Sequence, residues 1–175
     1  AATGVAELAL YLEKRAAQDG DSVATIGQLQ VPSGSVNVVP GRCQFSLDLR
    51  APTDAQRDAL VADVLAELAA IAARRGLRYT AERSMQAAAA PSHPLWQQRW
   101  ERALQALGVP LHRMPSGAGH DAMYVAHCGP SGMIFIPCRN GVSHNEAEYA
   151  SPEQLTAGAN VLLHALLNLT AASTY

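Results

Sequence analysis

The chain has 175 residues, which is enough for one ordinary domain or two small ones. Hydrophobic residues make up 49% of it and charged residues 16%, so a disordered tail is excluded and a packed core is expected. The formal net charge of −2 offers no basic surface for nucleic acid or for an anionic membrane. No run approaches the roughly 18 apolar residues that a membrane span requires.

The cysteines and the first residues of the chain suggest its compartment and its extent. Three cysteines are an odd count without paired spacing, so we expect no disulfide framework and a cytoplasmic location. The chain begins Ala-Ala-Thr-Gly, with neither an initiator Met nor a signal peptide. We therefore expect a fragment that starts inside a longer protein.

The first half of the chain predicts alternating helices and strands. Helical spacing of apolar residues over 5–12 predicts a helix, and alternation over 23–31 and 43–49 predicts two strands. Thr53 and Gln56 form a capping box that opens a long helix, with its apolar stripe at Leu60, Val64, Leu68 and Ile71 and its end at Gly76.

Alternation over 77–82 predicts a third strand after this helix. The order α-β-β-α-β is typical of a two-layer sandwich, here without its opening strand. Residues 87–91, a run of small residues ending in proline, are the best candidate for a linker.

The second half predicts three helices and one buried strand. Trp96 and Trp100 begin a helical pattern, and a glycine-rich stretch over 116–122 leads into a short helix. The apolar run 133–136 predicts a buried strand. The start of the last helix is indicated by Ser151, Pro152 and Gln154. Its predicted apolar stripe consists of Leu155, Ala159, Leu162, Leu166 and Leu169.

Two of the six histidines lie in contexts suited to chemistry. His120 follows two glycines that would let the backbone approach a ligand, although Asp121 could equally cap a helix there. His144 lies in a polar loop after the predicted buried strand, where Glu146 and Glu148 could support it as a metal ligand. The alternative is a solvated loop, because no second metal-ligand spacing accompanies His144. Surface or core roles suffice for the other four, His93, His112, His127 and His164.

Four segments, taken in order, resemble one family of enzymes. They are Asn-Val-Val-Pro-Gly-Arg (37–42), Ser-Leu-Asp-Leu-Arg (46–50), Ser-Gly-Ala-Gly-His-Asp-Ala (116–122) and Val-Ser-His-Asn-Glu-Ala-Glu-Tyr (142–149). The chain resembles the C-terminal part of the two-metal amidohydrolases that include N-carbamoyl-L-amino-acid hydrolases, allantoate amidohydrolases and β-ureidopropionases, of the zinc aminopeptidase-like clan. One departure is Glu146, which stands where the family usually has proline.

The resemblance implies an α/β fold in two parts. Residues 1–88 would form an α+β two-layer lid, ferredoxin-like but lacking its first strand, through which the protein forms a homodimer. Residues 89–175 would form the C-terminal part of a zinc-aminopeptidase-like α/β catalytic domain.

The resemblance also implies the roles of individual residues. His144 matches a metal-binding histidine, and His120 matches the catalytic histidine that contacts the substrate and stabilises the tetrahedral intermediate, with Gly119 beside it in the substrate site. Asn37 and Arg50 match lid residues that hold the substrate carboxylate. A planar guanidinium suits that task because it can hold a carboxylate through two hydrogen bonds.

The expected function is therefore hydrolysis of the C–N bond of an N-carbamoyl amino acid or a ureido acid such as allantoate. The full-length parent would hold two divalent metal ions, Zn or Mn, but the family's other ligands and its general base find no match here. We expect this chain alone to be inactive and to hold no metal tightly. The alternatives are a non-catalytic dimerisation or scaffold module, and an aminoacylase or dipeptidase of the same clan.

Overall fold

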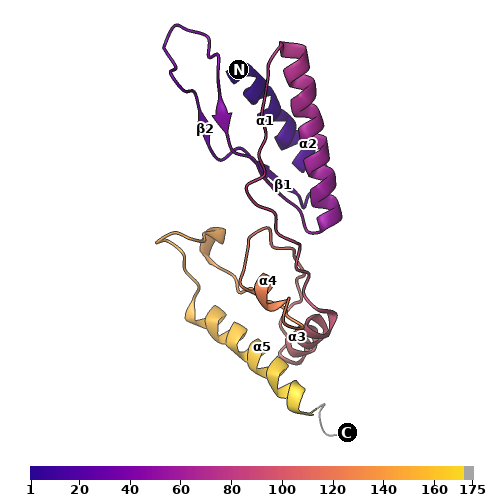
Figure 1. Cartoon of the computed structure of the whole chain (residues 1–175). Coiled ribbons are helices and arrows are strands. Elements are labelled where there is room, and N and C mark those ends of the chain that lie inside the picture. Colours follow the sequence, from indigo (N-terminus) through magenta and orange to yellow (C-terminus); the bar gives the residue numbers. More distant parts are fainter. Residues whose placement is uncertain (172–175) are drawn as a thin grey trace. The chain divides into compact units, whose positions relative to one another are not determined.

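The computed structural model describes the backbone of residues 1–171 and the side chains of residues 1–167. The chain divides into two compact units (Figure 1). The first unit contains Ala1–Ala89 together with Pro115–Gly119, and the second contains Ala90–Met114 and the chain from His120 onward. None of the described helices is both long and apolar enough to cross a membrane.

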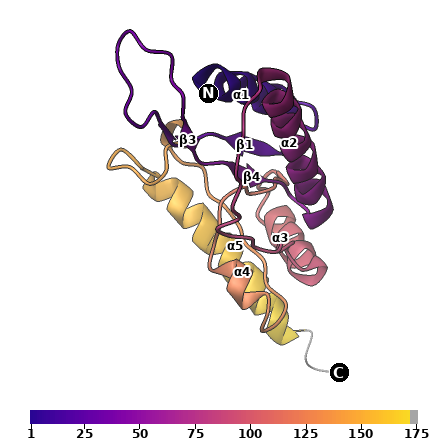
Figure 2. The same ribbon diagram turned by 45° about the horizontal axis from the view of Figure 1, so that its top comes forward.

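The first unit consists of two helices and a narrow antiparallel ribbon. Its elements are α1 (Ala2–Ala16), β1 (Val23–Thr25), β2 (Leu29–Gln30), β3 (Gln44–Phe45), β4 (Asp48–Arg50) and α2 (Asp54–Arg75). The helices α1 and α2 lie side by side in both views (Figures 1 and 2).

Each of the two predicted strands is split by a bulge. β1 pairs with β4, with Val23 opposite Arg50, and β2 pairs with β3, with Leu29 opposite Phe45. Between these pairs, the three residues 26–28 face the two residues 46–47. One extra residue on one strand is the definition of a β-bulge, and it bends and twists the ribbon.

The core of the first unit lies between the helices and the ribbon. Five side chains are at most 2% exposed: Leu8, Leu12, Leu60, Val64 and Ile71. Phe45, Leu47 and Leu49 pack against them from the ribbon, which confirms the predicted alternation. The predicted limits of α2 are also confirmed: the Thr53 side chain accepts a hydrogen bond from the Gln56 N–H, and Gly76 ends the helix at φ 62°.

The predicted strand over 77–82 is wrong. These residues have no regular secondary structure, although Leu77 donates its N–H to the Ala72 carbonyl as the helix ends. Alternation favours a strand only where a neighbouring strand supplies hydrogen bonds. No strand in the described part of the chain pairs with this segment.

The second unit contains α3 (Pro94–Ala106), α4 (Ala122–Val125), the 3₁₀-helix η1 (Arg139–Gly141) and α5 (Pro152–Ala171). Its core is a cluster of Trp100, Ala103, Val161 and Ala165. The ring of Trp96 stacks on that of Trp100, with centroids 5.4 Å apart. The predicted start of α5 is confirmed, because the Ser151 N–H donates to Gln154 and the Gln154 N–H donates back to the Ser151 hydroxyl.

The predicted strand over 133–136 is also wrong. The segment has no regular secondary structure and is partly buried, and no described strand pairs with it. It packs instead against α5, where a Cβ built on Gly158 would lie 2.4 Å from Ile136 Cγ2. Only a glycine permits that approach of the helix to Ile136.

The predicted apolar stripe of α5 is displaced. The buried residues are Val161 and Ala165, and Gly158 is on the same face by helical spacing. The residues predicted to be buried, namely Leu155, Ala159, Leu162 and Leu166, are exposed, and the Leu169 side chain lies outside the described residues. The helix thus turns its small residues inward because the chain packs close to it there.

Candidate functional site

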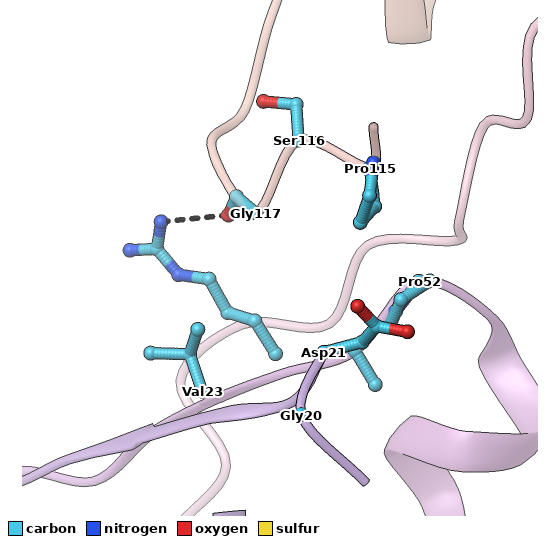
Figure 3. Close-up of a pocket in the computed structure, with 9 residues that line it drawn as sticks. Gly20, Asp21, Val23, Pro52, Pro115, Ser116 and Gly117 are labelled. Atoms are coloured by element: carbon cyan, nitrogen blue, oxygen red, sulfur yellow. Dashed lines mark hydrogen bonds between the residues drawn. The ribbon is translucent and has the colours of Figure 1, made fainter. Parts of the chain in front are cut away.

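Arg50 lies at the end of β4, in a small pocket of the first unit. The pocket has a volume of about 130 Å³ and is lined by Gly20, Asp21, Val23, Arg50, Ala51, Pro52, Pro115, Ser116 and Gly117. Arg50 Nη1 donates a hydrogen bond of 3.0 Å to the Gly117 carbonyl, which Figure 3 shows as a dashed line. The glycine-rich segment thus approaches the predicted carboxylate-binding arginine with its backbone.

Asp48 holds the other side of the Arg50 guanidinium. The two residues are two positions apart on β4 and so share a face of the strand. Arg50 Nε lies 2.9 Å from Asp48 Oδ1, and Nη2 also donates to Oδ2. This hydrogen bonding lowers the pKa of Asp48 and raises the pKa of Arg50, so both groups stay charged at neutral pH.

A donor count shows what Arg50 can still bind. A guanidinium has five N–H donors. Asp48 takes one from Nε and one from Nη2, and Gly117 takes one from Nη1. One donor remains on each terminal nitrogen, so two N–H groups are left for an acceptor such as a carboxylate.

Asp21 is a pocket residue that the sequence did not single out. It follows Gly20, which takes φ 74° in the turn between α1 and β1, and its carboxylate is seen beside Pro115 and Pro52 in Figure 3. The pocket therefore combines a cation and an anion. The signal that could have revealed it is its place two residues before Val23, the first residue of β1, which pairs with Arg50.

The structure does not bring Asn37 and Arg50 together. Asn37 is exposed in the loop after β2, and its Oδ1 accepts a hydrogen bond from the Ser35 hydroxyl. Arg50 is at the opposite end of the ribbon, roughly 20 Å of strand away at 3.3 Å per residue. The loop extends away from the ribbon in both views (Figures 1 and 2).

His120 belongs to the second unit and lies two residues before the start of α4. Its ring meets the Phe135 ring edge to face, with centroids 5.7 Å apart, and its carbonyl accepts the Met123 N–H. Asp121 makes no side-chain capping bond, so the capping alternative does not describe this turn. Gly119, the residue before His120, is exposed.

His144 is exposed in the loop that follows η1, with its backbone at φ 54°. Its N–H donates to Glu148 Oε2 at 2.8 Å. Glu148 was expected to support the imidazole, but it contacts the backbone of His144 instead. The remaining carboxylate of the loop, Glu146, is exposed.

The base of this loop is closed by two contacts between Arg139 and Tyr149. The Arg139 N–H donates to the Tyr149 carbonyl at 2.8 Å, and the guanidinium lies 4.2 Å from the centre of the tyrosine ring. The two ends of the loop are therefore fixed to each other, so that His144 is presented from a closed segment.

His144 fits a metal as one ligand, since an exposed imidazole is a usual donor to divalent ions. Within the residues whose side chains are described, no group of three or more His, Cys, Asp or Glu side chains could hold a metal. A catalytic zinc needs about three protein ligands. The role of His144 as a metal ligand therefore stays a prediction.

Comparison with known proteins places the chain in a family. Residues 2–168 match Peptidase family M20/M25/M40, and the chain belongs to this family. It is 38% identical over 164 residues to the N-carbamoyl-L-amino acid amidohydrolase of Geobacillus stearothermophilus, covering 94% of this chain and 40% of that protein. It is 34% identical over 146 residues to the allantoate amidohydrolase of Bacillus subtilis, covering 83% and 35%.

The fold is likewise similar to that of solved structures. An amidase of the hydantoinase/carbamoylase family from Burkholderia multivorans superposes with a TM-score of 0.89 at 38% identity, covering 96% of this chain and 41% of that one. The chain is thus a mixed α/β protein of an enzyme family whose members hydrolyse C–N bonds. It spans 40% of the length of the Geobacillus stearothermophilus relative and 35% of that of the Bacillus subtilis relative.

Proposed function

We propose that this chain is part of a metal-dependent amidohydrolase that hydrolyses the C–N bond of an N-carbamoyl amino acid or a ureido acid such as allantoate. The observation that carries the proposal is the Arg50 pocket, where two guanidinium donors remain for a carboxylate. Two relatives that match 94% and 83% of the chain are named for substrates of this class. The cytoplasm is the proposed compartment.

Each predicted site residue keeps a proposed role. Arg50 holds the substrate carboxylate, Asn37 and Gly119 add polar contacts to the substrate, and His120 donates a hydrogen bond to the oxygen that gains charge. His144 would hold one of two divalent ions, Zn or Mn. When bound, those ions supply a polarised carbonyl and a water of lowered pKa.

The other metal ligands and the general base are proposed to lie outside these 175 residues. The described side chains form no three-ligand group, and the chain spans only about 40% of its relatives. The isolated chain is therefore expected to be inactive. In this proposal residues 1–88 form a lid and residues 89–175 the end of the catalytic domain.

A homodimer through the lid is part of the proposal. Asn37 and Arg50 lie at opposite ends of one ribbon, too far apart for both to touch a single small substrate from one copy. A second copy that places its Asn37 near the Arg50 of the first would let both residues act on one substrate.

Arg50→Lys in the full reading frame that contains this chain tests the proposal. Lysine keeps the positive charge but lacks the paired N–H donors of the guanidinium, so KM for an N-carbamoyl-L-amino acid should rise at least tenfold. KM for the matching carboxamide, which lacks the charge, should change little. Arg78→Lys, an exposed arginine outside the pocket, is the control. An unchanged KM for the acid would remove Arg50 from the site.

A non-catalytic dimerisation module is the second candidate. The lack of a three-ligand group among the described side chains favours it. The longer reading frame decides between the two, since an enzyme requires further His, Asp and Glu ligands encoded there.

A further inference from the structure

We propose that Glu148 is a positioning residue that holds His144 in the backbone conformation from which its imidazole is presented. This inference rests on the proposed function, in which His144 is a metal ligand. The sequence pattern suggests Glu148 as a support for the imidazole, whereas the structure places its carboxylate on the His144 backbone N–H.

The first observation is the backbone of His144. Its φ of 54° is in the left-handed region, which is unfavourable for a residue with a Cβ because that atom crowds the neighbouring carbonyl oxygen. Such conformations persist where the surroundings determine them, and they cluster at functional sites. His144 is exposed, so burial does not hold it there.

The second observation is the hydrogen bond that does hold it. The His144 N–H donates to Glu148 Oε2 at 2.8 Å. A bond to a charged acceptor is stronger than one between neutral groups. It fixes the peptide plane that precedes the His144 Cα, and therefore the direction in which the imidazole leaves the chain.

A tight turn carries Glu148 back to His144. The Glu148 N–H donates to the Asn145 carbonyl, and Asn145 Oδ1 accepts the Ala147 N–H, each at 2.9 Å. An asparagine side chain that caps its own turn in this way is a recurrent local motif. The turn leads directly into Tyr149, which the Arg139 contacts fix at the base of the loop.

Glu146 offers a matched comparison within the same loop. It is the same residue type, two positions before Glu148 and also exposed. Among the described residues, its carboxylate makes no hydrogen bond or ion pair. Glu146→Ala and Glu148→Ala each remove one negative charge from the loop. Only Glu148→Ala also removes the hydrogen bond to the His144 N–H.

The test uses the protein expressed from the full reading frame. Zn²⁺ affinity is measured by competition with a chromophoric chelator for the parent, Glu148→Ala, Glu148→Gln, Glu146→Ala and His144→Ala. We expect Glu148→Ala to weaken binding about 10-fold, in the range found for residues that orient metal ligands. Glu148→Gln should recover most of the affinity because its amide oxygen still accepts the N–H, and Glu146→Ala should match the parent.

A second measurement follows the His144 amide itself by NMR in the 175-residue chain. Its hydrogen exchange should accelerate in Glu148→Ala and stay slow in Glu148→Gln and Glu146→Ala. Unchanged exchange in Glu148→Ala, or equal Zn²⁺ loss in Glu146→Ala, would overturn the inference. Full Zn²⁺ binding by His144→Ala would instead contradict the ligand assignment in the proposed function.

Discussion

The two units of the chain differ in the size of the side chains that they bury and in where their exposed leucines lie. In the first, five large side chains at 0–2% exposure are enclosed between α1, α2 and the ribbon. In the second, the buried set includes two alanines, and five leucines of α5 remain 42–57% exposed: Leu155, Leu162, Leu163, Leu166 and Leu167. Both tryptophans border the same apolar surface.

The first unit thus encloses a core of large side chains, whereas the second leaves a group of leucines exposed on α5. Isolated surface leucines are ordinary, but a group of them on one helix is not. The apolar segment 133–136 also runs beside α5 without a described strand partner. The second unit should therefore be the less stable one, and core substitutions should affect the units unequally.

Leu60→Ala should produce the largest effect. Leu60 is fully buried, so its truncation should lower the free energy of unfolding of the first unit by about 2–5 kcal/mol. Leu162→Ala, at a residue 43% exposed, should change stability by about 0.5 kcal/mol or less.

Urea unfolding can separate the units because both tryptophans, Trp96 and Trp100, belong to the second. Far-UV circular dichroism should show the Leu60→Ala loss while the tryptophan fluorescence transition stays in place. Equal shifts in both signals would mean that the two units unfold together, and would contradict a difference in their stability.

Gly158→Ala should have an intermediate effect, confined to the second unit. The added Cβ would lie 2.4 Å from Ile136 Cγ2, so the helix and the 133–136 segment must separate. Overpacking of this kind destabilises by about 1–3 kcal/mol. Gly129→Ala is the control, since nothing lies within 4 Å of its new Cβ. Tryptophan fluorescence in urea measures both, and a neutral Gly158→Ala would contradict the close packing of α5.

The smallest effect concerns pH and the helix pair of the first unit. Hydrogen bonds from Arg75 and Arg74 lower the pKa of Glu7. A carboxyl whose pKa is lower in the folded state adds stability above its unfolded pKa, and that stability disappears as the pH falls. The stability difference between the parent and Glu7→Gln should be present at pH 7 and shrink below about pH 4. A stability difference that increased as the pH fell would contradict a lowered pKa of Glu7 in the folded state.

Local signals in the sequence predicted helix limits better than strands. Thr53, Gly76 and Ser151 act through bonds to residues a few positions away, so their patterns were sufficient. The segments 77–82 and 133–136 have strand-like patterns, but a strand also requires a partner, and alternation cannot show one. The predicted buried face of α5 is wrong because the prediction followed the leucines. The helix instead buries the face of Gly158, where the chain packs closely.

For the candidate site, the sequence likewise predicted some features and not others. The motifs identified Arg50, His120 and His144, but not the contacts that hold them. The bonds from Arg50 to Gly117 and from His144 to Glu148 depend on how the chain turns, which residue types alone do not specify. The separation of Asn37 from Arg50 likewise depends on how the strands of the ribbon pair, which the sequence does not specify.

The most direct test of the proposed function measures metal content and ammonia release together. The 175-residue chain and the protein from the full reading frame are incubated with Zn²⁺ or Mn²⁺ and then with N-carbamoyl-L-amino acids or allantoate. We predict about two metal ions per chain and hydrolysis for the longer protein only. Hydrolysis by the 175-residue chain, or a longer protein that binds metal but attacks none of these substrates, would contradict the account.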